Sequence, residues 1–212
     1  MQLDFSTIDP RTAYFWMAST IAPRPVAWVT TQSAAGVTNL APFSFFQMIT
    51  PEPPTLMISP LLHPNGNMKD TARNIQETGE FVVNLVPFGL VDTMNATSFS
   101  YGTDESEIER CNVATLASTS VRPPRVAGVP VSFECRMASI TAYPADKPSC
   151  HMILGQVVTA HVDEKILDAA GQIDPVKLDL VSRMGADWYG RMSGEANFAL
   201  GRPVGWNAAG LK

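Results

Sequence analysis

The chain has 212 residues, of which 45% are hydrophobic and 17% are charged, so it can bury the core of one folded domain. Its net charge of −5 argues against a broadly basic nucleic-acid-binding surface. The N-terminus lacks a signal-peptide pattern and no run is apolar enough to span a bilayer. We therefore expect a cytoplasmic protein with no nucleic-acid or membrane partner.

Residues 1–22 are expected to form a capping segment, in which Asp9-Pro10 opens a short helix through Thr12 to Met17. Pro23 and Pro25 then impose extended backbone and set the start of a strand from Val26 to Thr31. Gly36 permits the turn that follows. A returning segment runs from Asn39 to Phe46, and a short buried strand covers 56–59.

The middle of the chain mixes helices with strands. A helix is predicted over Thr71–Thr78, capped by Asp70 and ended by Gly79, with Met68, Ala72 and Ile75 on its buried face. A strand follows at 81–86. A second helix is then expected over 87–99, and an exposed polar turn over 104–110.

The last third is predicted to contain two more strands. Alternation marks a half-buried strand at 133–137, and His151–Val162 forms a long apolar strand in which Gly155 signals a bulge or a close backbone approach. A short helix is expected at 177–183. From Met184 the glycine- and aromatic-rich chain is expected to form an irregular arm over another surface. Hairpin-like links predominate, so the pattern predicts a mainly β, antiparallel barrel with peripheral helices.

The motifs of several enzyme classes are absent. There is no G-x-G-x-x-G or Walker loop, and Ser44 lacks a G-x-S-x-G setting. The three cysteines form no C-x-x-C pair, which suggests a reducing compartment, and the three histidines form no metal-binding motif. We therefore assign no catalytic side chain and no metal site, and an enzyme of this kind often takes its chemistry from a cofactor.

Two stretches have the composition of a binding site, although each also has an ordinary structural explanation. Between Arg24 and Phe46 the chain combines hydroxyls, Asn39 and three phenylalanines, which suits either a hairpin core or a pocket for a flat, heteroatom-edged ring. Lys69 stands at the start of a helix beside the Thr71 hydroxyl, which suits either an anion site or a capped surface helix. Asp70 competes for the same donors.

Two further side chains have open alternatives. Arg24 is either a phosphate ligand or an exposed charge at the edge of a strand. His151 either faces a nicotinamide or is a hydrogen-bonded structural histidine.

Taken together, these motifs resemble the flavin reductase-like, FMN-binding split-barrel family, which includes flavoredoxin. The resemblance runs over roughly residues 21–191. It is carried by these blocks: Pro23-Arg24-Pro25-Val26, Trp28-Val29-Thr30-Thr31, Asn39-Leu40-Ala41-Pro42-Phe43-Ser44-Phe45-Phe46, Pro53-Pro54 and Ser59, Lys69-Asp70-Thr71-Ala72-Arg73-Asn74-Ile75, Thr78-Gly79-Glu80-Phe81-Val82-Val83-Asn84, Gly155-Gln156-Val157-Val158 and Gly185-Ala186-Asp187-Trp188-Tyr189.

The resemblance implies a six-stranded antiparallel split barrel over residues 1–190, a C-terminal arm over 191–212 that packs on the barrel or on a partner, and a homodimer with FMN near the interface. It implies that Thr30, Thr31 and Ser59 contact the phosphate or ribityl chain, and that Lys69 and Thr71 hold the phosphate, with Arg24 as a further candidate. It implies that Asn39 and the backbone from Ala41 to Ser44 meet the polar edge of the ring and that Phe45 shapes its apolar wall. The cofactor-binding residues implied are Arg24, Val29, Thr30, Thr31, Asn39, Ala41, Pro42, Ser44, Phe45, Ser59, Lys69, Asp70 and Thr71.

The activity that the resemblance implies is hydride transfer from NAD(P)H to bound flavin, with electrons passed to an unknown small-molecule acceptor. One departure concerns Pro148-Ser149-Cys150-His151, where short reductases of the family often carry Gly-Asp-His; only the histidine is retained. Two alternatives therefore stay open: an FMN-binding electron carrier reduced by a protein partner, and a binding module without redox chemistry.

Overall fold

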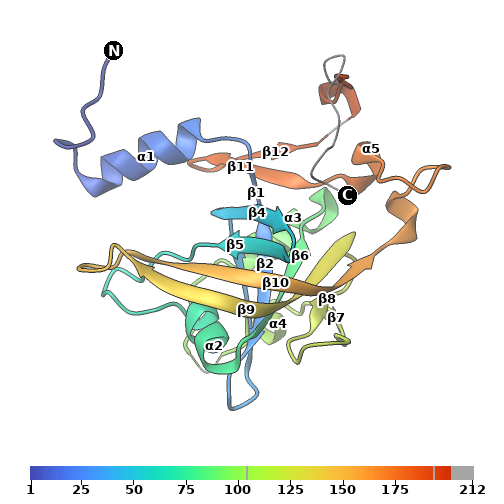
Figure 1. Ribbon diagram of the computed structural model, residues 1–212, viewed down its shortest axis with the longest axis horizontal. Helices are drawn as coiled ribbons and strands as arrows, with labels where there is room; N and C mark the ends of the chain where they lie inside the picture. The colour runs from blue at the N-terminus through green and yellow to red at the C-terminus, as the bar shows by residue number, and fades with distance from the viewer. Residues whose placement is uncertain (104, 193, 202–212) are drawn as a thin grey trace.

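A computed structural model describes residues 1–103, 105–192 and 194–201. Its main feature is a seven-stranded antiparallel sheet with the strand order β3-β2-β6-β9-β10-β5-β4 (Figure 1). The strands are β2 (Ala27–Gln32), β3 (Thr38–Phe43), β4 (Phe46–Pro51), β5 (Pro54–Ile58), β6 (Glu80–Leu85), β9 (Val131–Tyr143) and β10 (Cys150–Val162).

The sheet is curled into a barrel, and the short link at Ser44–Phe45 shows that its two outer strands come together. Strands β3 and β4 lie at opposite ends of the hydrogen-bonding order, yet only Ser44 and Phe45 separate them in sequence. The two outer strands must therefore meet at this corner while remaining unpaired along their length, which is a barrel with an open seam. The split barrel predicted from the sequence is confirmed, with seven strands in the main sheet where six were expected.

Strand β2 is buried on both faces because apolar groups cover it from both sides. Ala27 and Val29 belong to a core cluster inside the barrel, together with Phe81 of β6. Trp28 and its neighbours form a second cluster on the other face, against α3 (Val91–Ala96). Side chains alternate between the faces of a strand, so one strand anchors both cores.

Helix α2 (Asp70–Thr78) closes the first core. Ala72 and Ile75 are fully buried and Met68 packs against the same cluster, so the buried face predicted for this helix is confirmed. Gly79 ends the helix at a φ of 72°, a left-handed conformation that glycine adopts without strain. The predicted cap is wrong: the helix begins at Asp70, and Lys69 occupies the N-cap position without a side-chain cap bond.

A second, three-stranded sheet lies beside the barrel, in the order β1-β11-β12. It joins β1 (Arg24–Pro25) to the hairpin of β11 (Val181–Gly185) and β12 (Trp188–Arg191). Helix α1 (Pro10–Thr20) packs on this sheet, and Asp9 caps it by accepting hydrogen bonds from the Arg11 and Thr12 N–H groups.

Three predictions after residue 86 are corrected. The segment 87–99 is broken into a 3-10 turn, Phe88–Leu90, and α3, which ends at Ala96. The short helix expected at 177–183 lies earlier, as α5 (Pro175–Leu178). The chain after Met184 includes a regular hairpin, not an irregular arm, because β11 finds pairing partners in β1 and β12. Much of the predicted 191–212 arm lies outside the described residues.

The polar turn expected at 104–110 contains α4 (Glu107–Arg110). Glu107, the first residue of this helix, is buried, whereas the turn was expected to be exposed. The remaining short pairs and turns are β7 (Thr115–Leu116), β8 (Arg125–Val126) and the 3-10 turns Glu164–Ile166 and Gly194–Ala196. No helix among the described residues is long and apolar enough to cross a bilayer.

Candidate functional site

Two buried hydrogen bonds fix α2 against the strands that precede it. The Asn39 side-chain amide on β3 donates to the Thr71 hydroxyl at 2.9 Å, and the Asn74 amide donates to the Thr31 hydroxyl at 3.0 Å. All four side chains are buried. The first turn of α2 is thus held in one position relative to β2 and β3.

Lys69 supplies a positive charge at the start of this helix. Among the described residues no carboxylate lies within ion-pair distance of its ammonium group, whereas Asp70 is paired with Arg73 at 2.5 Å. Burial lowers the pKa of Lys69. Its Nζ atom lies 5.9 Å from the centre of the Phe43 ring. A half-buried cation beside the unpaired N–H groups of a helix start favours an anionic ligand.

Lys69 lies between two cavities. The smaller one, of about 60 Å³, is lined by Asn39, Lys69, Thr71 and Glu107 and is covered by the segment Thr97–Tyr101. Its small size and the polar groups among its lining residues suit a small charged group.

The larger one, of about 150 Å³, has a lining suited to a ring. It is formed by Phe43, Ser44, Phe45 and Ser59 together with Tyr14 of α1. The Tyr14 and Phe45 rings are tilted against each other with centres 6.3 Å apart. Because Lys69 lines both cavities, the two cavities adjoin at this residue.

The structure brings together most of the residues implied by the resemblance. Nine of the thirteen line one or both of these cavities: Asn39, Ala41, Pro42, Ser44, Phe45, Ser59, Lys69, Asp70 and Thr71. The side chains of the other four, Arg24, Val29, Thr30 and Thr31, line neither cavity.

These four side chains are engaged inside the fold. Val29 belongs to the inner core, and the Thr30 hydroxyl donates to the Pro124 carbonyl at 2.5 Å. The Arg24 guanidinium donates to the carbonyls of Ala18 and Ile21 at the end of α1. Arg24 is only 7% exposed, so the alternative of an exposed strand-edge charge is wrong. Its Nε lies 3.4 Å from the Ser44 hydroxyl, at the edge of the larger of the two cavities.

Several lining residues were not identified from the sequence. Glu107, Tyr14 and the Thr97–Tyr101 segment reach the site only through tertiary packing. Their local sequence carries no binding motif, so no signal in the chain marked them. His151 lines neither cavity; burial lowers its pKa, and its Nδ1 atom has no hydrogen-bond partner in the described part of the chain.

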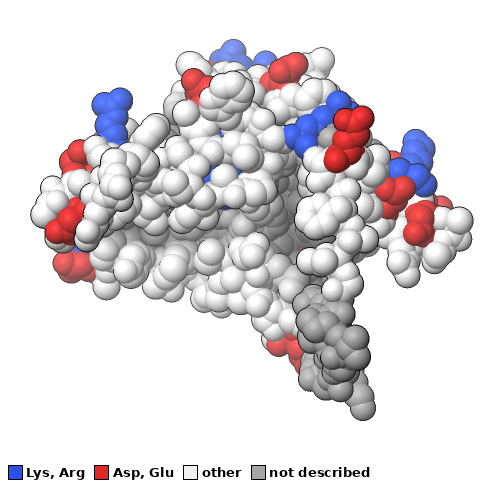
Figure 2. Space-filling model, turned by 90° about the horizontal axis from the view of Figure 1, so that it is seen from above, with Lys and Arg blue, Asp and Glu red and all other residues white. Residues whose placement is uncertain are grey.

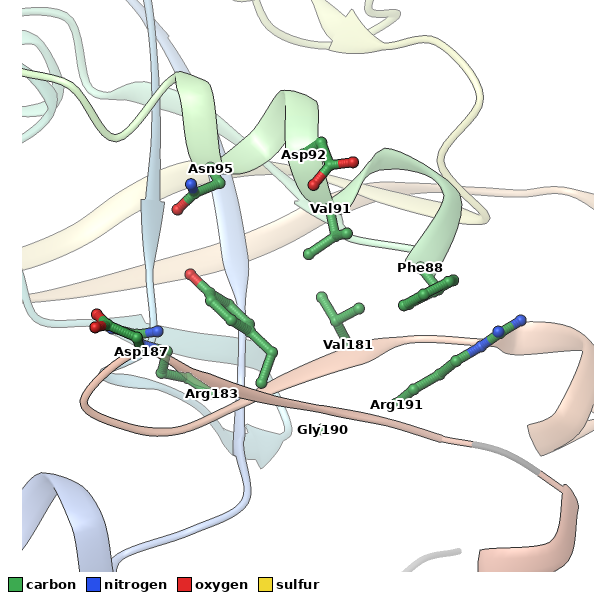
Figure 3. Close-up of a pocket in the computed structure, with 10 residues that line it drawn as sticks. Phe88, Val91, Asp92, Asn95, Val181, Arg183, Asp187, Gly190 and Arg191 are labelled. Carbon is green, nitrogen blue, oxygen red and sulfur yellow. The ribbon is translucent and has the colours of Figure 1, made fainter.

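A larger cavity of about 500 Å³ lies elsewhere, between α3 and the β11–β12 hairpin. In Figure 3, Val91 and Val181 face each other across it, with Phe88 and Arg191 at one end and Arg183 and Asp187 at the other. It shares no residue with the cavities beside Lys69. On the face shown in Figure 2, Lys and Arg side chains lie in separate small groups interspersed with acidic ones.

The fold and the paired cavities define a class of protein, and comparison with known proteins assigns the chain to it. Residues 17–177 match the family model of the flavin reductase like domain. The chain therefore belongs to this family.

Individual relatives are similar along almost the whole chain. The uncharacterized protein YwrF of Bacillus subtilis (strain 168) is 36% identical over 199 residues, covering 92% of this chain and 96% of the relative. Nitrilotriacetate monooxygenase component B from Bacillus cereus superposes with a TM-score of 0.88 at 30% identity, covering 94% of this chain and 98% of the other. The 2-nitrobenzoate 2-nitroreductase NbaA of Pseudomonas fluorescens gives a TM-score of 0.86 at 25% identity, covering 99% and 100%.

Proposed function

We propose that this protein is an FMN-binding oxidoreductase that accepts hydride from NAD(P)H and passes the electrons to a small-molecule acceptor. The observation that carries the proposal is Lys69, a half-buried cation without an ion-pair partner in the described chain, placed between a small cavity at the start of α2 and a larger one with aromatic walls. FMN has a matching division into a phosphate end and a flat ring. Membership of the flavin reductase like family supports the same assignment.

The donor set of the small cavity fits a phosphate group. Lys69 offers a charge, the first turn of α2 offers backbone N–H groups, and Thr71 and Asn39 offer polar side chains held by their mutual hydrogen bond. We propose that these residues hold the phosphate. Asp70 is partly neutralised by its pairing with Arg73.

The aromatic cavity fits one edge of a flavin ring. Ser44, Ser59 and the backbone near Pro42 would meet polar ring atoms, and Phe45 would exclude water from an apolar edge. Bound FMN supplies the hydride-accepting and electron-transferring chemistry. The residues of this chain bind the ring, orient it and keep water from it. For Arg24, Val29, Thr30 and Thr31 we propose a supporting role behind these contacts.

We also propose that two copies of the chain form a homodimer. The aromatic cavity of about 150 Å³ is small for a three-ring system, so another surface is needed to enclose the ring. Helix α1, which contributes Tyr14 to that cavity, also exposes Phe15 and Met17 by 53% and 49%. A partner that covers α1 would complete the wall of the site.

An anaerobic titration tests the redox proposal. The purified protein is mixed with FMN and then with NADH or NADPH, and bleaching of the flavin absorption is followed. We expect reduction faster than that of free FMN under the same conditions. A protein that binds FMN but shows no faster reduction would instead be an electron carrier. One that does not bind FMN would be a binding module of another kind.

Substitution of Lys69 tests the site. We expect Lys69→Met to weaken FMN binding by roughly tenfold or more, because among the described residues Lys69 is the only lysine or arginine that lines the proposed phosphate cavity. Lys147→Met, at an exposed turn, is the matched control and should bind FMN as the wild type does. Equal FMN affinity in the wild type and Lys69→Met would refute the placement of the phosphate.

A further inference from the structure

Glu107 is an unexpected residue to find beside a proposed phosphate site. It is the first residue of α4 and is only 7% exposed. Its Oε2 atom accepts a hydrogen bond from the Leu40 backbone N–H at 2.9 Å. The Ser106 and Thr38 hydroxyls, 2.8 Å apart, hold the same segment to β3. Since β3 is an outer strand, the carboxylate satisfies an N–H group that has no partner strand on that side.

The position of Glu107 places its charge in the same cavity as Lys69, Asn39 and Thr71. Burial raises the pKa of Glu107, and the charge of Asp70 acts in the same direction. A carboxyl group beside an anion site opposes the ligand when it is ionised. The carboxylate of Glu107 therefore lies where the proposed phosphate site needs a positive or neutral group. Its hydrogen bond with the Leu40 N–H does not explain the negative charge, because any oxygen acceptor could make that bond.

We propose that Glu107 sets the affinity of the site for phosphorylated flavins: its carboxylate opposes the FMN phosphate and so keeps FMN exchangeable. This inference rests on the proposed function. The opposition acts on the phosphate and not on the ring, because Glu107 lines the small cavity and not the aromatic one. Riboflavin, which has the same ring without the phosphate, is unaffected.

The same geometry makes FMN binding depend on pH. Phosphate in the cavity favours the protonated form of Glu107, so binding is coupled to proton uptake and FMN affinity falls as pH rises through the titration of this carboxyl. The other titratable groups that line the cavity are His63, Lys69, Asp70 and Tyr101. In the pH experiment His63 is replaced by glutamine, so that its ring contributes no charge to the cavity.

Titrations of flavin fluorescence test the role of Glu107. Glu107→Gln keeps an oxygen for the Leu40 N–H and removes the charge. We expect it to tighten FMN binding by about tenfold and to leave riboflavin binding within about twofold of the wild type. Glu109→Gln, an exposed change on the same helix, should match the wild type for both ligands.

Equal effects of Glu107→Gln on both flavins, or no effect on FMN, would overturn the inference while leaving FMN binding intact. A wild-type protein that binds neither flavin would instead refute the proposed function and this role with it. Should Glu107→Gln fail to fold, His63→Gln alone decides. Its ratio of FMN to riboflavin affinity should fall as pH rises from about 4 to about 5.5, below the second ionisation of the phosphate near pH 6, and a flat or rising ratio in that range would overturn the inference.

Discussion

At the scale of single residues, Gly155 occupies a position in the core with no room for a side chain. A Cβ atom at Gly155 would lie 2.2 Å from the Phe81 ring and 3.3 Å from the Cys135 Cβ. The ladder between β9 and β10 is also irregular there, with a register shift between Leu154 and Gly155. The bulge or close approach predicted for this glycine is confirmed, and both are present.

We expect Gly155→Ala to lower the free energy of unfolding by about 1–3 kcal/mol, because a rigid ring and a core residue must shift to admit the methyl group. Chemical denaturation measures the change. Gly89→Ala is the control, since nothing lies within 4 Å of its added Cβ. Equal stability of the two variants would show that the core absorbs the methyl group without strain.

Glu134 is a fully buried carboxylate that holds a loop to the barrel. It accepts hydrogen bonds from the backbone N–H groups of Thr119, Ser120 and Val121 and lies 2.5 Å from His161 Nε2. Burial alone raises the pKa of Glu134, but the bonds from Thr119, His161 and Ser120 outweigh it and leave the pKa below its ordinary value of 4.5.

A carboxyl group whose pKa is lowered by folding stabilises the protein fully above its unfolded pKa. That contribution is lost as pH falls through the folded value. We therefore expect the wild type to lose stability on acidification below about pH 4.5, more steeply than Glu134→Gln does. At pH 7 the variant should be less stable by roughly 1–3 kcal/mol. Thermal melts across pH check both points, and parallel pH profiles would contradict the assignment.

At the scale of elements, α1 is tied to the rest of the chain through Arg24. The guanidinium binds two carbonyls at the end of the helix, and only Ala18 of α1 is a buried residue. We expect Arg24→Met to increase amide exchange throughout α1 and to leave exchange in β9 and β10 unchanged. Hydrogen-exchange mass spectrometry measures this. Arg191→Met, which removes an exposed pair with Asp179, should leave α1 protected. Unchanged exchange in α1 of Arg24→Met would contradict the anchoring role.

Elements were predictable where the local sequence sufficed. Strands such as β2 and β10 and the helix α2 follow from apolar periodicity, prolines and a terminal glycine. The β11–β12 hairpin was missed because its pairing with β1 joins residues far apart in the chain. The site residues also differ in how well the sequence predicts them. Lys69 and Thr71 stand at a recognisable helix start, whereas Glu107 reaches them only when α4 packs on β3.

At the scale of the whole molecule, the proposed dimer gives a direct prediction. Static light scattering at micromolar concentration should give twice the chain mass of 23.0 kDa. The physical reason is that α1 and the aromatic cavity expose apolar side chains that a second copy would cover. A mass of one chain at that concentration would contradict it.

The Ser44–Phe45 corner has a consequence for engineering the barrel. Each inserted residue can span at most about 3.3–3.6 Å, so lengthening this two-residue link would let the outer strands drift apart by a comparable amount per insertion. The Gly36 turn, in contrast, joins β2 and β3, which are already held together by a hydrogen-bond ladder. It can therefore be extended without separating these strands. Grafting a loop should therefore succeed at the Gly36 turn, whereas a loop grafted at Ser44–Phe45 should separate β3 from β4 and widen the open seam of the barrel.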